Sequence, residues 1–166
     1  MRVRVLRVLT LGVMLALVGP LAQPAGAITI GEGEGCTPGF WKNHLGAWEE
    51  YSPSDLLSES FTLPAGYEHL GDATMLQALK WSGGPTLEDA MKNLLKHAVT
   101  AFLNAAHDDL EYPYRRFGNP YNIQATVNAA LASLNRAQIV QVKNELDEVN
   151  NGDCTTRKSD NTTGGK

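Results

Sequence analysis

Hydrophobic residues recur every three or four positions through much of the chain after Cys36, and the longest such pattern begins at Leu87. On a helical wheel its apolar residues form one broad face, made of Leu87, Met91, Leu94, Leu95, Ala98, Phe102, Ala105 and Ala106. Thr86, followed three residues later by Asp89, is close to a capping box. The pattern therefore predicts a central core helix from Leu87 to about Leu110.

Two more amphipathic helices are predicted in the C-terminal part of the chain. The first has apolar residues at helical spacing, namely Ile123, Val127, Ala130, Leu131 and Leu134. Asn135, with Gln138 three residues later, is expected to start the second helix, whose apolar positions are Ile139, Val142, Leu146 and Val149. The sequence Asn150-Asn151-Gly152 is typical of a helix end.

Shorter elements are predicted before the central helix. Thr37 followed by Pro38 is typical of an N-cap and the first position of a helix. A cap-like turn at 52–55 is expected to start a turn or two of helix, residues 58–71 an irregular loop, and Asp72 the cap of a helix over 73–81. We therefore expect an all-α fold, a small single-domain helical bundle of about five helices.

The stretch from Cys36 to Trp48 is the richest in unusual residues. Trp41, His44, Leu45 and Trp48 lie at i, i+3, i+4 and i+7, which predicts that they share one buried helix face. The candidate motif and core residues are Trp41, Asn43, His44 and Trp48.

A polar stripe is predicted on the other side of the central helix, made of Asn93, His97, Thr100, Asn104 and His107. Exposed helix faces usually carry Lys and Glu, so these uncharged amides and imidazoles indicate either an interhelical hydrogen-bond network or a recognition groove. We favour the network, because it needs no ligand.

The N-terminus resembles a secretory signal peptide. Arginines precede an apolar run over 8–18, and Ala25 and Ala27 provide small residues for cleavage after Ala27. That run is shorter than the ~20 residues that span a bilayer, so we expect no membrane span. The predicted organisation is a signal peptide (1–27), a flexible leader (28–35), a helical domain (36–154) and a disordered tail (155–166). The protein is expected to be secreted and extracellular, with the cell surface or the periplasm as alternatives.

Removing residues 1–27 takes away three arginines and no acidic residue, which leaves 11 basic and 18 acidic side chains and a net charge of −7. This charge disfavours nucleic acid and anionic lipid as partners. A protein or cell-surface partner is expected instead.

Two cysteines, Cys36 and Cys154, flank the helical region. In a protein exported to an oxidising compartment, an intramolecular disulfide that ties the two ends is the simplest interpretation. Free thiols and an intermolecular bridge are the alternatives.

The histidines provide the candidates for metal chemistry. His44 could be a metal or haem ligand or a general base, but a buried histidine bonded to a backbone carbonyl is the more common case. His97 and His107 are ten residues apart on one predicted helix, about 15 Å of rise, so they do not share one ion. No catalytic or cofactor motif is found. We therefore expect a non-catalytic interaction or structural module without a cofactor, and the alternative is a metal- or haem-binding protein or metal-dependent enzyme that uses His44, His97 or His107.

The sequence from Cys36 to His44 resembles the CTPGxWKNH motif that opens a family of small secreted prokaryotic domains of unassigned function. Later blocks are also similar, at residues 94–99, 103–107, 112–113, 127–131 and 145–154, whereas residues 115–122 depart from the family pattern. The resemblance implies an extracellular all-helical domain and brings no catalytic residues.

Overall fold

The structure is a computed structural model that describes residues 34–119 and 121–155. This part of the chain contains six α-helices and two short 3-10 helices, in the order α1 (Pro38–Asn43), η1 (Leu45–Ala47), α2 (Leu57–Ser60), η2 (Glu68–Asp72), α3 (Met75–Ala78), α4 (Leu87–Ala106), α5 (Ile123–Ala132) and α6 (Arg136–Asn150). Three isolated β-bridges occur, and no strand is present in the described ranges. The prediction of an all-α fold is confirmed. The predicted signal peptide, most of the leader and the tail after Thr155 lie outside the described residues.

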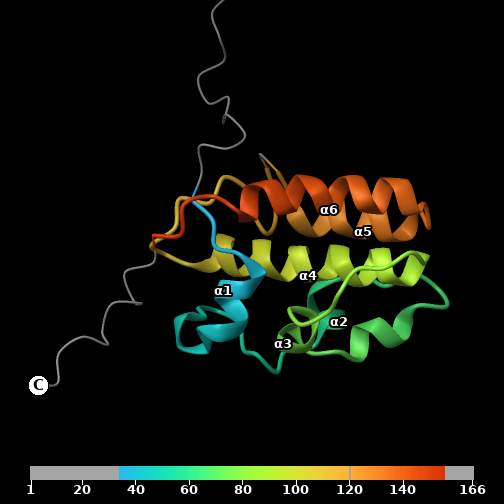
Figure 1. The fold of residues 1–166 in the computed structure, drawn as a ribbon, viewed down its shortest axis with the longest axis horizontal. Coiled ribbons are helices and arrows are strands. Elements are labelled where there is room, and N and C mark those ends of the chain that lie inside the picture. The colour runs from blue at the N-terminus through green and yellow to red at the C-terminus, as the bar shows by residue number, and fades with distance from the viewer. Residues whose placement is uncertain (1–33, 120, 156–166) are drawn as a thin grey trace, which may run out of the picture.

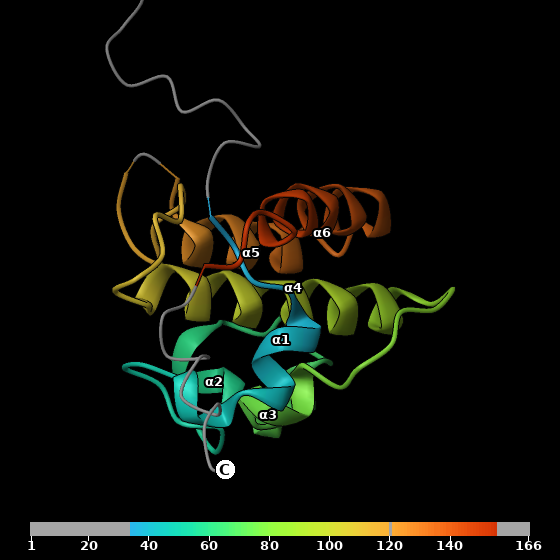
Figure 2. The same cartoon turned by 60° about the vertical axis from the view of Figure 1, so that its left-hand side comes forward.

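Helix α4 lies in the middle of the fold (Figures 1 and 2). Helices α5 and α6 cover one side of it, and the short helices α1, α2 and α3 lie on the other side. Its predicted apolar face is almost entirely buried, and only Leu87 and Ala105 keep partial exposure. Because α4 packs against both layers, side chains outside the apolar face also become buried, which determines the environment of the polar stripe.

The two ends of α4 are set by side-chain hydrogen bonds. At its N-terminus the Thr86 hydroxyl accepts from Asp89 N at 3.0 Å and the Asp89 carboxylate accepts from Thr86 N at 3.1 Å, so the predicted capping box is confirmed. The helix ends at Ala106, four residues before the predicted Leu110. The predicted end was wrong because His107 adopts an extended conformation and the N–H groups of the next residues are bonded to side chains.

Helices α5 and α6 begin at asparagine caps. Asn122 accepts from Ala125 N at 2.9 Å, and Asn135 accepts from the N–H groups of both residues 137 and 138. The four predicted core positions of α6 are buried. Leu134 departs from the prediction, because it follows the end of α5 with a φ of 50° and is 47% exposed.

The segment before α4 departs from the prediction in several places, and its third helix, α3, is shorter than the predicted helix over 73–81. Thr37 caps α1 and Pro38 occupies its first turn, as expected. The third helix is capped by Thr74, with Gln77 completing a capping box, so the prediction of Asp72 as the cap was wrong. The region predicted as an irregular loop, residues 58–71, contains most of α2 and all of η2 except its last residue.

Candidate functional site

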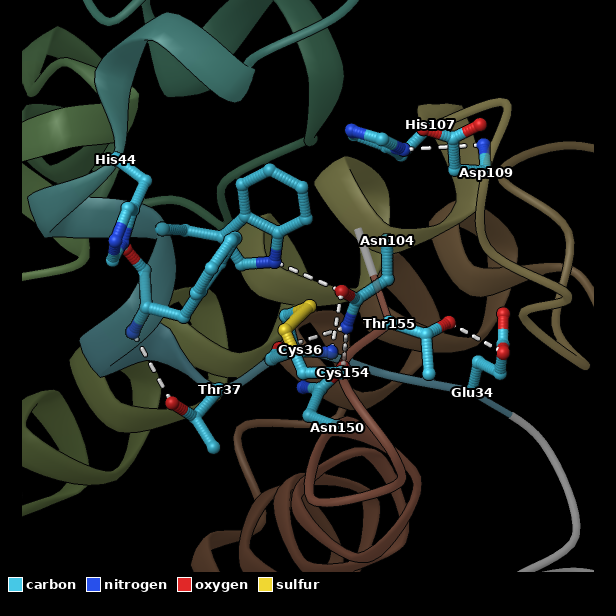
Figure 3. The surroundings of a disulfide bond; sticks show 12 residues. Glu34, Cys36, Thr37, His44, Asn104, His107, Asp109, Asn150, Cys154 and Thr155 are labelled. Atoms are coloured by element: carbon cyan, nitrogen blue, oxygen red, sulfur yellow. Dashed lines mark hydrogen bonds between the residues drawn. A yellow bond between two sulfur atoms is a disulfide. The ribbon is translucent and has the colours of Figure 1, made fainter. Parts of the chain in front are cut away.

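A disulfide between Cys36 and Cys154 ties the two ends of the helical domain, as predicted (Figure 3). The two Cα atoms lie 4.7 Å apart across a sequence separation of 118 residues. Cys36 is fully buried, whereas Cys154 is exposed. Beside the disulfide, Gly35 N donates to Asp153 O at 3.1 Å and the Thr155 hydroxyl bonds to the Glu34 carboxylate. Residues 34–35 therefore lie beside residues 153–155, next to the covalent link.

Asn104, in the last turn of α4, is the centre of the polar contacts next to this disulfide. Its Oδ1 accepts from Cys36 N at 2.8 Å and from the Trp41 indole Nε1 at 2.9 Å. Its Nδ2 donates to Cys36 O at 3.0 Å and to Asn150 Oδ1 at 3.0 Å. The side chain is 0% exposed, and all four hydrogen-bonding positions of the amide are used.

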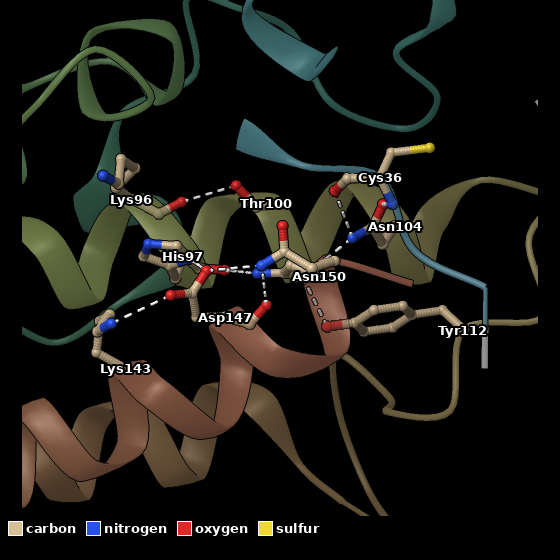
Figure 4. Close-up of polar contacts among 10 residues, drawn as sticks. Cys36, Lys96, His97, Thr100, Asn104, Tyr112, Lys143, Asp147 and Asn150 are labelled. Carbon is tan, nitrogen blue, oxygen red and sulfur yellow. Dashed lines mark hydrogen bonds and ion pairs between the residues drawn. The ribbon is translucent and has the colours of Figure 1, made fainter. Parts of the chain in front are cut away.

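A second buried amide, Asn150, extends this network into the last turn of α6 (Figure 4). Its Oδ1 accepts from Asn104 Nδ2 and from the Tyr112 hydroxyl at 2.8 Å, and its Nδ2 donates to His97 O at 3.0 Å. Burial raises the pKa of Tyr112 well above its usual range, so this phenol remains a donor at neutral pH. We call Asn104 and Asn150 the amide hub. The hub joins the N-terminal segment, α4, the 107–122 connector and α6.

His97 lies beside the hub, between α4 and α6, and is 6% exposed. Its Nδ1 is 3.4 Å from Asp147 Oδ1, and Asp147 Oδ2 is 3.2 Å from Lys143 Nζ. Burial lowers the pKa of His97 to about 4. The Asp147 carboxylate opposes this effect only in part, and the positive charges of Lys96 and Lys143 add to it. His97 is therefore neutral at pH 7.

The other residues of the polar stripe do not share one site. Thr100 is fully buried and its hydroxyl donates to Lys96 O, one turn earlier in the same helix, at 2.9 Å. Asn93 is partly buried, with its Oδ1 lacking a partner among the described residues. His107 is 3% exposed, and its Nδ1 accepts from Asp109 N at 3.2 Å. That bond places the proton of the neutral ring on Nε2, which is buried and has no hydrogen-bond partner in the described part of the chain.

His44 is exposed, so the prediction that it lies on a buried helix face was wrong, and Asn43, named as a motif or core residue, is exposed as well. Helix α1 ends at Asn43, which breaks the i, i+3, i+4, i+7 relation. Their side chains instead complete the helix end: Asn43 Nδ2 donates to Gly39 O at 2.9 Å and His44 Nδ1 donates to Phe40 O at 2.8 Å. The His44 ring also stacks on Phe40 with a centroid distance of 4.2 Å. Both side chains therefore add hydrogen bonds within α1 and its C-terminal cap, and the His44 backbone N–H also donates to Phe40 O, at 3.0 Å.

The two tryptophans of the motif have different environments. Trp41 is fully buried and bonded to Asn104, and its ring centroid is 5.7 Å from that of His107. Trp48 is only partly buried, and its Nε1 donates to Trp41 O at 2.9 Å. Leu45 is 44% exposed. The predicted shared face thus reduces to Trp41, with Trp48 packed at its edge.

The histidines named as alternative metal ligands are not brought together. His44 follows α1 and His107 follows α4, and Figure 3 shows their rings apart. His97 lies ten residues before His107, at the α6 side of α4. Within the ranges 34–119 and 121–155, no three His, Cys, Asp or Glu side chains are grouped so that they could hold a metal ion.

Some residues of the network were missed by the sequence analysis. Asn150 was assigned to a helix stop, Tyr112 to a connector, and Asp147 to no role, yet all three contact the hub or His97. One signal was available, because Asn150 follows Val149 and Leu146 on the buried side of the last helix.

Searches with protein-family models, among curated proteins and among solved structures gave no match. The resemblance of residues 36–44 to a secreted domain family therefore stays a prediction. Among the helices of the described residues, none has the length and apolar character needed to cross a membrane.

Proposed function

We propose that the protein is a secreted, non-catalytic helical module that acts through a protein or cell-surface partner or as a structural element. The observation that carries the proposal is the amide hub. Asn104 is the most buried polar residue of the stripe together with Thr100, and it uses all four of its hydrogen-bonding positions on other parts of the same chain. A side chain saturated in this way holds the fold together and has no position left for a ligand.

The motif at the start of the domain supports the same conclusion. Thr37 caps α1, the side chains of Asn43 and His44 bond the carbonyls of residues 39 and 40, and Trp41 anchors the helix to the hub. Each of these residues therefore has a structural role that accounts for its presence without a substrate.

Secretion is supported by the predicted signal peptide together with the disulfide. A disulfide that closes a long loop is typical of oxidising compartments. Edman sequencing of the mature protein from its native compartment tests this part of the proposal, with Ile28 expected as the first residue. A mature chain that retains residues 1–27 would contradict export by this route.

Metal analysis and an absorption spectrum of the same protein test its chemical class. We expect no stoichiometric metal and no Soret band. A metal or haem that is lost in His44→Ala or His107→Ala, with far-UV circular dichroism unchanged, would establish the alternative function instead.

Photo-crosslinking tests the expected partner directly. Leu45 and Leu134 are matched positions, because they are 44% and 47% exposed and lie in different parts of the fold. A photoreactive residue at each position should give a defined adduct on native cells at one position and not at the other. Equal, diffuse labelling at both positions, or none, would remove the support for a specific interaction and leave only the structural role.

A further inference from the structure

The chain contains one Asn-Gly pair, Asn151-Gly152, immediately after α6. In such a pair the backbone nitrogen of glycine can attack the side-chain Cγ of asparagine. A C–N bond forms to give a five-membered succinimide, the Cγ–Nδ2 bond breaks, and ammonia leaves with the proton of the glycine nitrogen. One water molecule then opens the ring at either carbonyl, which leaves aspartate or isoaspartate. Glycine favours this reaction because it has no side chain that shields the nitrogen and its backbone rotates freely.

The fold exposes Asn151 to water but restrains both reacting groups. Asn151 Nδ2 donates to Asp147 O at 2.6 Å and to Asp147 Oδ1 at 2.9 Å. Gly152 N donates to Val149 O at 3.3 Å. The attack therefore requires that the last turn of α6 opens, because the side chain must leave Asp147 and the Gly152 nitrogen must leave its carbonyl.

The disulfide holds this turn in place. Cys154 follows Gly152 by two residues, and its partner Cys36 is fully buried with its main chain bonded to Asn104. Gly35 N also bonds Asp153 O at 3.1 Å, so the residue before Cys154 is anchored by a hydrogen bond as well. Reduction releases residues 152–155 from the covalent part of this anchor.

We propose that Asn151 is a spontaneous deamidation site. The hydrogen bonds at the end of α6 slow the reaction in the folded, oxidised protein, and opening of the Cys36–Cys154 disulfide accelerates it. The product is expected to weaken the helix end. A carboxylate at position 151 lacks the Nδ2 donor and faces the Asp147 carboxylate, and both negative charges lie at the C-terminus of a helix, where the helix dipole disfavours them. Because the reaction releases ammonia and does not reverse, aspartate or isoaspartate at position 151 would mark the molecules in which the disulfide has been opened.

Peptide mapping by mass spectrometry tests the proposal on three samples incubated at mildly alkaline pH. These are the oxidised mature protein, the same protein reduced and alkylated, and a synthetic peptide of residues 147–153. We expect the peptide to convert and the oxidised protein to convert at least about tenfold more slowly, which corresponds to about 1.4 kcal/mol of local opening. The reduced protein should convert faster than the oxidised protein, because the segment after α6 has lost its covalent anchor. Asn119 is an internal control, because the nitrogen of the following Pro120 carries no proton and is not a nucleophile.

Three outcomes would overturn the proposal. A peptide that does not convert would show that the pair is not labile, and an oxidised protein that converts as fast as the peptide would show that the fold does not close it. A reduced protein that stays as slow as the oxidised one would remove the role of the disulfide. Hydrogen exchange of the Gly152 amide in the oxidised protein provides a measurement that does not depend on a variant, and fast, unprotected exchange would contradict the proposed closure.

Discussion

Replacing Asn104 by alanine removes four hydrogen bonds that one buried side chain makes. The N–H and C=O of Cys36 and the Nε1 of Trp41 lose this partner inside the protein. Asn150 keeps its bond from Tyr112. A buried donor or acceptor without a partner destabilises a protein by about 1–3 kcal/mol. Because the three groups surround the same space and share any water that enters it, we expect a total loss of about 3–5 kcal/mol.

A matched control is available at Asn128 on α5. Its Oδ1 accepts from Thr62 N at 2.9 Å and its Nδ2 lies 3.4 Å from the Thr62 hydroxyl, so it also joins segments distant in sequence. These contacts are exposed. Water can replace them, and Asn128→Ala should therefore lower the free energy of unfolding by less than about 1 kcal/mol.

Urea denaturation of the oxidised proteins, followed by tryptophan fluorescence and by far-UV circular dichroism, measures both effects. A double-mutant cycle of Asn104→Ala with Trp41→Phe then isolates the bond to the indole, with an expected coupling of about 1 kcal/mol. If Asn104→Ala loses no more stability than Asn128→Ala, the structural importance assigned to the hub is refuted.

Three other perturbations have expected outcomes. His97 has a pKa of about 4 in the folded protein and about 6.5 when unfolded, so the folded state binds fewer protons between these pH values. The contribution of His97 to the free energy of unfolding is complete above pH 6.5 and should fall by no more than about 3 kcal/mol down to pH 4. Urea titrations at several pH values should show this fall in the wild type and a flatter dependence in His97→Gln. Reduction of the Cys36–Cys154 disulfide should lower the free energy of unfolding by about 2–5 kcal/mol, and the double serine variant should match the reduced wild type in the same assay rather than show a further loss. Gly35→Ala should lower the melting temperature, because a Cβ there would overlap a backbone carbonyl of the last turn of α6. Gly46→Ala is the control and should leave the melting temperature unchanged, because the space around Gly46 is open. Equal melting temperatures for the two variants would contradict the close backbone approach at Gly35.

The long helices could be predicted because their signals are local. The caps at Thr86 and Asn135 and the apolar spacing of α4 and α6 are contained within a few turns of chain. The disulfide was predictable from the number of cysteines and the signal peptide. Short helices were less predictable, since a single turn has too few positions to show a period. For this reason α1 was predicted too long, and His44 was placed on a buried face that does not exist.

The hub could be predicted only in part. The residue types on the polar side of α4 indicated an interhelical network, and Asn104 does bond to α6 through Asn150. The partners could not be identified, because three of its four bonds go to Cys36 and Trp41, more than sixty residues away in sequence. Two of these bonds are made with the main-chain N–H and C=O of Cys36. Because main-chain groups do not depend on the residue type, the sequence does not reveal such partners. A buried polar side chain requires partners, but the requirement does not say which segment supplies them.

Cys36 is held by a noncovalent contact and by a covalent bond that act on different atoms of this residue. Asn104 binds the main-chain N–H and C=O of Cys36, whereas the disulfide uses its sulfur. The amide contact therefore needs no oxidation, and it defines where the backbone of Cys36 lies against α4. The disulfide acts mainly by restricting the unfolded chain, while the amide bonds exist only in the folded state. The hub therefore fixes the backbone of Cys36 against α4 through bonds that do not depend on the sulfur–sulfur link.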